Sequence, residues 1–163
     1  MNFLGHVGLA LLVASGMSAA LQLSLLAVLW TCGIASIMAV VPDKDIRSAY
    51  LSHRGVTHSI LFACTASIAI GALSHFLLTF HPQICEIAAS VLHMSPFIAG
   101  FTPAFIGTAT HLAGDVVTYS GIPLFWPSKK RFSLGLFGSK NAAVNIMAGL
   151  AGFAAFIALT WTV

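Results

Sequence analysis

Charged residues are rare in this chain. Only four of its 163 residues are acidic and seven are Lys or Arg, so charged residues make up 7% of the chain, whereas 58% are hydrophobic. Water-soluble domains carry about 25% charged residues, and the mean hydropathy here is +0.97. The shortage of charge indicates an integral membrane protein, with a core-rich soluble helical protein as the weaker alternative.

Two further absences narrow the class of protein. The three cysteines, Cys32, Cys64 and Cys85, are odd in number and have no Cys-x-x-Cys spacing, which argues against a disulfide framework and against a thiolate metal site. The first forty residues contain no Lys or Arg, so the first apolar run lacks the positive region that opens a cleavable signal peptide. We therefore expect the N-terminus to be retained.

The apolar residues fall into runs long enough to cross a bilayer, whose hydrocarbon core of about 30 Å needs about 20 helical residues. We place spans at Phe3 to Ala20, Leu21 to Val41, His58 to Phe80, Pro96 to Tyr119 and Ala142 to Val163. The first is the shortest and could instead lie in the interface. We also expect a tight turn at Ser18 to Ala20 and an apolar helical stretch from Gln83 to Met94. The prediction is an all-α, polytopic membrane bundle of four to five transmembrane helices, forming a single domain over residues 1–163.

The basic residues are confined to two connections. Lys44, Arg47 and Arg54 follow the second span, and Lys129, Lys130, Arg131 and Lys140 follow the fourth. If the five spans alternate in direction, both connections lie on the same side of the membrane. The positive-inside bias assigns that side to the cytoplasm. We therefore expect a multi-pass protein of the inner (plasma) membrane with this face toward the cytoplasm.

Residues that can bind a metal gather on the same side. They are His6 in the first span, Asp43 and Asp45 after the second, His53 and His58 before the third, and His111 and Asp115 near the end of the fourth. Ionisable residues within a membrane are costly and usually functional. Oxygen and nitrogen ligands without thiolates suit Zn²⁺ first and Mn²⁺ as an alternative. The sequence therefore predicts a divalent metal site at this face.

These residues also have structural explanations. His111 and Asp115 share one helix face as an i, i+4 pair, but Asp115 could simply orient His111. Asp43 and Asp45 could form an ordinary acidic loop, and His6 could be an interfacial histidine. The metal site is favoured because four separate stretches converge on one membrane face.

The run from His53 to Ser59 combines two histidines with an arginine. Gly55 allows a tight turn and Thr57 can cap the third helix, so both imidazoles can face one centre; an ordinary helix start is the alternative. Arg54 is suited to stabilising a phosphoryl group, although it could serve as a topology signal only. A carboxylate that does not ligate the metal could accept a proton from water. We therefore predict Asp45 and Arg54 as catalytic residues.

Taken in order, these motifs resemble those of a known family. Pro42-Asp43-Lys44-Asp45, His53-Arg54-Gly55-Val56-Thr57-His58-Ser59 and His111-Leu112-Ala113-Gly114-Asp115 are similar to the signature of bacterial and archaeal inner-membrane metal-dependent hydrolases. That family is distantly similar to zinc-dependent phospholipase C. The resemblance implies a helical, membrane-bound, phosphoesterase-like hydrolase. One departure argues against a full trinuclear zinc site: Glu86 is the only glutamate, so a second pair of the form His-x-x-x-Glu does not exist here.

Three functions agree with these observations. The first is a hydrolase that acts on phosphoesters of lipids or amphiphiles at the cytoplasmic membrane face through a metal-activated water. A metal or proton transporter ranks second, because transport sites usually lie near the membrane midplane and no Asp, Glu, Lys or Arg falls near the middle of a span. A non-catalytic scaffold clipped by a metal ranks third. The expected partners are membrane lipids and such a phosphoester substrate, not nucleic acid; the oligomeric state is left open.

Overall fold

The computed structural model describes residues 1–47, 55–80, 86 and 94–163. In this part of the chain the regular elements are all helical. The long helices are α1 (Phe3–Ala20), α2 (Leu25–Met38), α3 (Ile60–Thr79), α5 (Pro96–Val116) and α6 (Ala142–Thr162), and the short 3₁₀ helices are η1 (Pro42–Arg47) and η2 (Val56–His58). Outside them, the loop 117–141 forms two isolated bridges. The prediction of an all-α protein is confirmed.

Each long helix begins at a polar residue that caps it. The side chains of Asn2, Ser24, Ser59, Ser95 and Asn141 each accept a hydrogen bond from the backbone N–H three residues further along. Such caps satisfy one of the backbone donors that the first helical turn leaves unpaired. The short polar residues between the apolar runs therefore fix where each helix starts.

Two local predictions were wrong. The turn does not lie at Ser18 to Ala20: α1 continues through Ala20, since alanine is the best helix former, and the chain reverses at Gln22, which has a φ of 51°. Ser59, not Thr57, caps α3, because a turn of 3₁₀ helix containing Thr57 comes first. The helical stretch expected from Gln83 to Met94 lies, except for Glu86 and Met94, outside the described residues.

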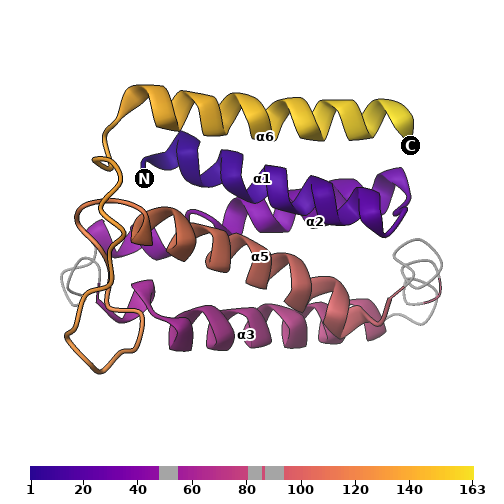
Figure 1. The fold of residues 1–163 in the computed structure, drawn as a ribbon. Coiled ribbons are helices and arrows are strands. Elements are labelled where there is room, and N and C mark those ends of the chain that lie inside the picture. The colour runs from indigo at the N-terminus through magenta and orange to yellow at the C-terminus, as the bar shows by residue number, and fades with distance from the viewer. Residues whose placement is uncertain (48–54, 81–85, 87–93) are drawn as a thin grey trace.

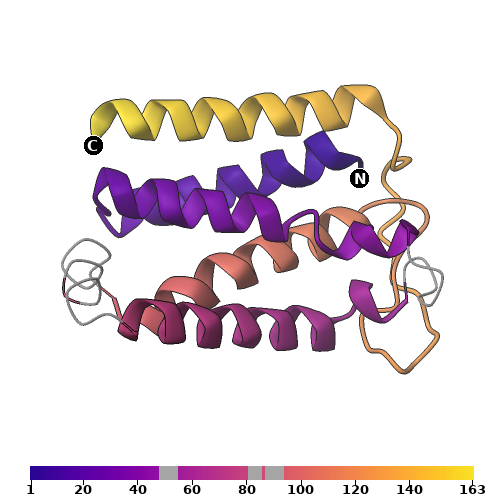
Figure 2. The ribbon, with the colours of Figure 1, turned by 180° about the vertical axis from the view of Figure 1, so that it is seen from behind.

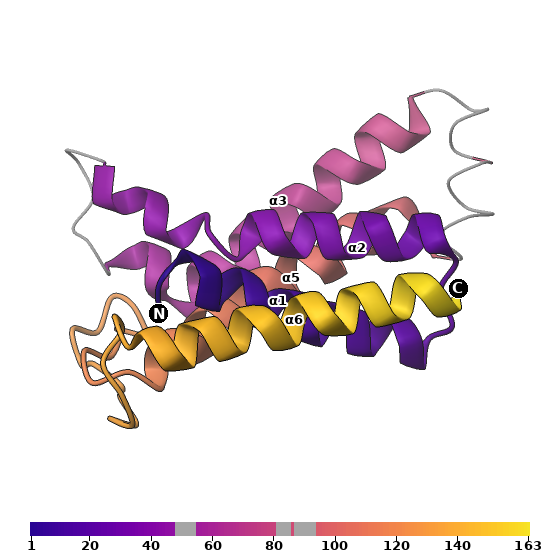
Figure 3. The same ribbon diagram turned by 90° about the horizontal axis from the view of Figure 1, so that it is seen from above.

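The five long helices run side by side in alternating directions (Figure 1). α6 packs on α1, α1 packs on α2 and α5, and α5 packs on α3. α2 lies behind α1 in Figure 1 and therefore in front of α1 when the molecule is seen from behind (Figure 2). The view from above shows that the C-terminal end of α3 diverges from the other helices (Figure 3). α1 is half buried, whereas only 22% of α3 and 17% of α6 are buried. The outer helices thus expose long apolar surfaces of the kind that lipid covers.

Within the described residues, four helical segments are long and apolar enough to cross a membrane, namely Phe3–Ala20, Leu25–Lys44, Ile60–Thr79 and Ala142–Thr162. The second of these joins α2 to the start of η1. α5 is not among these four, but its 21 residues give a length of about 31 Å, close to the thickness of a hydrocarbon core. α5 also runs antiparallel beside α3 (Figure 1). The structure therefore agrees with the predicted polytopic bundle of four to five spans.

One end of the bundle gathers the N-terminus, η1, η2 and the loop 117–141, as the left side of Figure 1 shows. The opposite end holds the turn between α1 and α2 and the C-terminal end of α6. Every Lys and Arg within the described residues belongs to η1 or to the loop 117–141. The alternation of spans predicted this grouping.

Candidate metal centre

His111 is held in place by a close approach of α5 to α2. A Cβ atom at Gly107 would collide with the carbonyl oxygen of Ala35, so only glycine lets the two helices come this near. One turn further along α5, His111 Nδ1 lies 2.7 Å from the carbonyl oxygen of Ala39 and must donate to it, because a carbonyl can only accept. In a neutral ring this bond leaves a lone pair on Nε2, on the side away from Ala39.

His58 faces His111 from η2. Its Nδ1 lies 3.0 Å from the hydroxyl oxygen of Thr57, and its Nε2 lies 3.2 Å from Nε2 of His111. Both imidazoles are completely buried. Two Nε2 lone pairs at this separation would repel each other, so either His58 donates a proton to His111 or a cation lies between the two nitrogens.

Two carboxylates complete the group. His58 Nε2 lies 3.4 Å from Asp43 Oδ1 and 3.5 Å from Asp115 Oδ2, and His111 Nε2 lies 3.8 Å from each of the same oxygens. Asp115 comes from the last turn of α5 and its side chain is 1% exposed, whereas Asp43 comes from η1 and is 27% exposed. Three of the four residues are thus buried, and the group reaches solvent at Asp43.

The spacing of these four donors fits a metal ion. Ligand atoms of Asp43, His58, His111 and Asp115 all lie within 4.8 Å of one another. A tetrahedral Zn²⁺ with bonds of about 2.0 to 2.1 Å holds its ligand atoms about 3.3 Å apart, and the histidine separations above run from 3.2 to 3.8 Å. Two imidazole nitrogens and two carboxylate oxygens also form a donor set suited to Zn²⁺ or Mn²⁺.

His6 adds a fifth candidate from α1. Its buried ring stacks on His111 with the centroids 3.9 Å apart, and its Nε2 lies 3.4 Å from Asp115 Oδ1 and 3.9 Å from Asp43 Oδ2. Within the described part of the chain neither ring nitrogen has a hydrogen-bond partner of acceptable geometry. An unsatisfied buried polar group costs about 1 to 3 kcal/mol. His6 is therefore placed to bind an ion or a water molecule beside the four-residue group.

The first two residues, Met1 and Asn2, pack beside the candidate metal ligands. The amino group of Met1 donates to Asp115 Oδ1, so this oxygen has a cationic partner while Oδ2 faces the two histidines of the group. The backbone N–H of Asn2 donates to the buried side chain of Asn145 over 3.0 Å. A Cβ atom at Gly5 would collide with that side chain, so glycine is needed here.

Asn145 is a positioning residue that the sequence analysis missed. Its Nδ2 donates to the carbonyl oxygens of Ser139 and Asn141 at 3.0 and 2.7 Å, which fixes the amide at the start of α6. Its Oδ1 accepts the hydrogen bond from the backbone N–H of Asn2, which ties α6 to the start of α1. The available signal was an amide side chain inside an otherwise apolar run. A single amide does not reveal which helix it binds, because that depends on packing.

The structure brings together five of the seven predicted metal ligands: His6, Asp43, His58, His111 and Asp115. The backbone of Asp45 belongs to η1, but its side chain lies outside the described part of the structure, as do His53 and Arg54. Ligand roles for Asp45 and His53, and catalytic roles for Asp45 and Arg54, stay predictions from the sequence.

Comparison with known proteins identifies one matching family. The model of the YdjM inner membrane protein family matches residues 1–163, and no curated protein or solved structure matches the chain. The family description agrees with the predicted inner-membrane location and supports neither a hydrolase activity nor a similarity to phospholipase C. With the whole chain covered and several helices fit to cross a bilayer, the protein belongs to the YdjM inner membrane protein family.

Proposed function

We propose that the protein is a metal-dependent hydrolase that acts at the cytoplasmic face of the inner membrane on a phosphoester of a lipid or amphiphile. The observation that carries the proposal is the group of Asp43, His58, His111 and Asp115, whose ligand atoms lie within 4.8 Å of one another. Buried ionisable groups in a membrane protein are expensive to keep and usually serve a function. The basic segments at the same end of the bundle favour the cytoplasmic side.

The burial of the four residues suggests which of them bind the metal and which one acts as a base. His58, His111 and Asp115 are buried and would hold the ion, whereas Asp43 is 27% exposed and lies where water can reach it. A divalent metal in this place would supply a nucleophilic water near neutral pH. In the proposed reaction Asp43 accepts the proton from that water. This assignment leaves an open coordination position, which a catalytic site needs.

A phosphoester is the preferred substrate class because of the charges at this end. Lys129, Lys130 and Arg131 are all exposed on the loop 117–141, and clustered cations beside a membrane attract anionic headgroups. Arg54, which follows η1 in the chain, is the predicted partner of the phosphoryl oxygens. A lipid or amphiphile is favoured over a soluble ester because the centre lies at the end of helices fit to span the membrane.

The test is turnover of a generic phosphodiester by detergent-purified protein loaded with Zn²⁺ or Mn²⁺. Asp43→Asn keeps the size of the side chain but removes the base, so we expect retained metal and a rate lower by about 10² to 10⁴. Glu86→Gln makes the same chemical change at an exposed residue outside the group and should leave the rate unchanged. A metal-loaded wild type without turnover on phosphoesters would overturn the hydrolase proposal, and an unchanged rate in Asp43→Asn would remove Asp43 as the base.

A second candidate is a non-catalytic scaffold in which the metal is a structural clip. It is favoured by the number of donors, since four protein ligands within 4.8 Å can close a tetrahedral site completely. In that case chelation would lower the unfolding temperature and Asp43→Asn would lose metal. Retained metal in that variant separates the hydrolase from the scaffold.

A further inference from the structure

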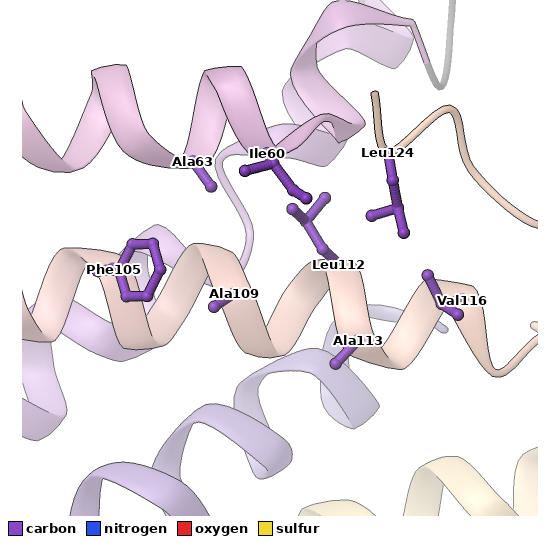
Figure 4. Close-up of a pocket in the computed structure, with 8 residues that line it drawn as sticks. All are labelled: Ile60, Ala63, Phe105, Ala109, Leu112, Ala113, Val116 and Leu124. Carbon is purple, nitrogen blue, oxygen red and sulfur yellow. The ribbon is translucent and has the colours of Figure 1, made fainter. Parts of the chain in front are cut away.

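An apolar groove runs between α3 and α5 (Figure 4). It has a volume of about 270 Å³ and is lined by eight apolar residues, among them Ile60 and Ala63 of α3 and Phe105 and Leu112 of α5. No lining side chain can form a hydrogen bond. The groove therefore suits a hydrocarbon chain and offers nothing to the backbone of a peptide.

Several residues that line the groove are neighbours in the chain of the candidate metal ligands. Leu112 and Val116, which line it, directly follow His111 and Asp115 in α5, and Ile60 lies two residues after His58. From Val116 to Phe105 the groove follows α5 for about 16 Å, from the end of α5 that carries His111 and Asp115 toward the start of that helix (Figure 4). A chain lying in it would have its polar end near the metal ligands.

A series of contacts leads from the groove to a cation on the loop 117–141. Leu124 lines the groove and its carbonyl oxygen accepts a 2.9 Å hydrogen bond from the backbone of Ile60, which fixes the loop on α3. The next residue, Phe125, contacts the ring of Phe132 edge to face at 5.3 Å, and Lys130 Nζ lies 5.6 Å from the centre of the Phe132 ring. These contacts connect the apolar lining to Lys130 within one small loop.

We propose that this groove and the basic loop bind one anionic phospholipid, with an acyl chain between α3 and α5 and the phosphate at Lys129 and Lys130. A lipid is favoured over a protein partner because α3, which forms one wall of the groove, exposes a long apolar surface in a protein of the inner membrane. An anionic headgroup is favoured over a zwitterionic one because Lys129 and Lys130 are exposed on the same loop that contributes Leu124 to the lining. The role of this lipid as substrate rests on the proposed function, whereas its binding does not.

The fold contains a matched groove for comparison. A cavity of about 350 Å³ between α1 and α6 is lined by Leu12, Gly16 and Ala155, among others, toward the C-terminal end of α6. That end of the bundle lies opposite the basic loop (Figure 1). Ala109 and Ala155 are both half-buried alanines lining an apolar groove, so a tryptophan at either position makes the same chemical change.

The experiment is native mass spectrometry of the full chain in detergent, with phosphatidylglycerol and phosphatidylcholine of identical acyl chains as probes. We expect the wild type and Ala155→Trp to retain phosphatidylglycerol preferentially, and Ala109→Trp to lose this preference. Replacing Lys129 and Lys130 by Gln, both at exposed loop positions, should lower phosphatidylglycerol retention by about fivefold for each cation removed.

Two results would overturn the proposed site. One is equal retention of phosphatidylglycerol by Ala109→Trp and Ala155→Trp, and the other is unchanged retention after both lysines are replaced. Metal content measured in the same samples keeps the two proposals apart. A wild type without metal that still selects phosphatidylglycerol contradicts the hydrolase alone, whereas a metal-loaded wild type without lipid preference contradicts the groove alone.

Discussion

His111 uses its two ring nitrogens for different purposes. Nδ1 donates to the carbonyl oxygen of Ala39, and Nε2 faces His58 and the two carboxylates. His58 has the same arrangement, with Nδ1 beside the Thr57 hydroxyl and Nε2 toward the centre. Metal-binding histidines typically have such a partner on the second nitrogen, which orients the ring. The hydrogen-bond partners on Nδ1 of both histidines therefore favour a metal site over a simple hydrogen-bonded cluster.

Thr57→Val removes the hydroxyl beside His58 while keeping the shape of the side chain. Because loss of such an orienting partner usually weakens metal binding about 10- to 100-fold, we expect Zn²⁺ affinity to fall in that range in a competition titration with a chromogenic chelator. Thr65→Val is the matched control, since the Thr65 hydroxyl is exposed and bonds to the backbone of its own helix. Equal affinity of the wild type and Thr57→Val would contradict an orienting role for Thr57.

The sequence allowed some of these residues to be predicted and not others. His111 and Asp115 share a helix face whatever the tertiary structure, so their pairing was predictable. The stacking of His6 on His111, and the hydrogen bond that the backbone N–H of Asn2 donates to Asn145, depend on how α1 packs on α5 and α6. Contacts between residues more than one hundred positions apart leave no local pattern in the chain.

At the scale of elements, glycines control how closely the helices meet. A Cβ atom at Gly8 of α1 would collide with the carbonyl group of Ala148 in α6 and lie 2.6 Å from Cα of Gly149. On the facing helix, a Cβ atom at Gly152 would collide with the backbone of Gly8. Small residues at such crossings let helix backbones pack closely in membranes. The α1–α6 pair is thus built on reciprocal glycines.

Gly8→Ala should therefore separate α1 from α6. Forcing an extra methyl into a close contact typically costs about 1 to 3 kcal/mol, so we expect a lower unfolding temperature in detergent, followed by intrinsic tryptophan fluorescence. Gly16→Ala lies on the same helix with nothing within 4 Å of the added Cβ, and should be neutral or slightly stabilising. If both variants unfold at the same temperature, the close crossing is not a source of stability.

Helix positions could be predicted from the apolar runs, but helix ends only approximately. α5 and α6 begin at the expected Pro96 and Ala142, whereas α2 begins at Leu25 rather than Leu21. The difference arises at the caps, because several polar residues near each boundary could serve and packing selects one of them. Which helix lies beside which could not be inferred, since all the apolar runs look alike.

At the scale of the whole molecule, the alternation of spans determines where the chemistry lies. Counting spans was enough to predict that the candidate ligands and the basic residues share one end, which the described elements show (Figure 1). Counting spans could not predict the distances between the candidate ligands. They depend on η1 and η2, two short elements with no apolar pattern of their own.

The proposed orientation predicts opposite labelling of the two ends. A cysteine at exposed Ser128 in the basic loop should react with a membrane-impermeant maleimide only in inverted vesicles, because the proposed orientation places that loop in the cytoplasm. A cysteine at exposed Leu21, in the turn between α1 and α2, should react in intact spheroplasts. Both are made in a background with the native cysteines replaced by alanine. Labelling of both positions from the same side would contradict the alternation of spans.

The metal content of the detergent-purified full chain tests the central proposal most directly. By inductively coupled plasma mass spectrometry, we expect about one Zn²⁺ or Mn²⁺ per chain in the wild type, because the candidate ligands form one compact group. We expect the same content in His75→Ala, where the lost histidine is exposed on α3, and little or none in His111→Ala. A wild type without stoichiometric metal, or equal metal in His111→Ala and His75→Ala, would contradict the proposed centre.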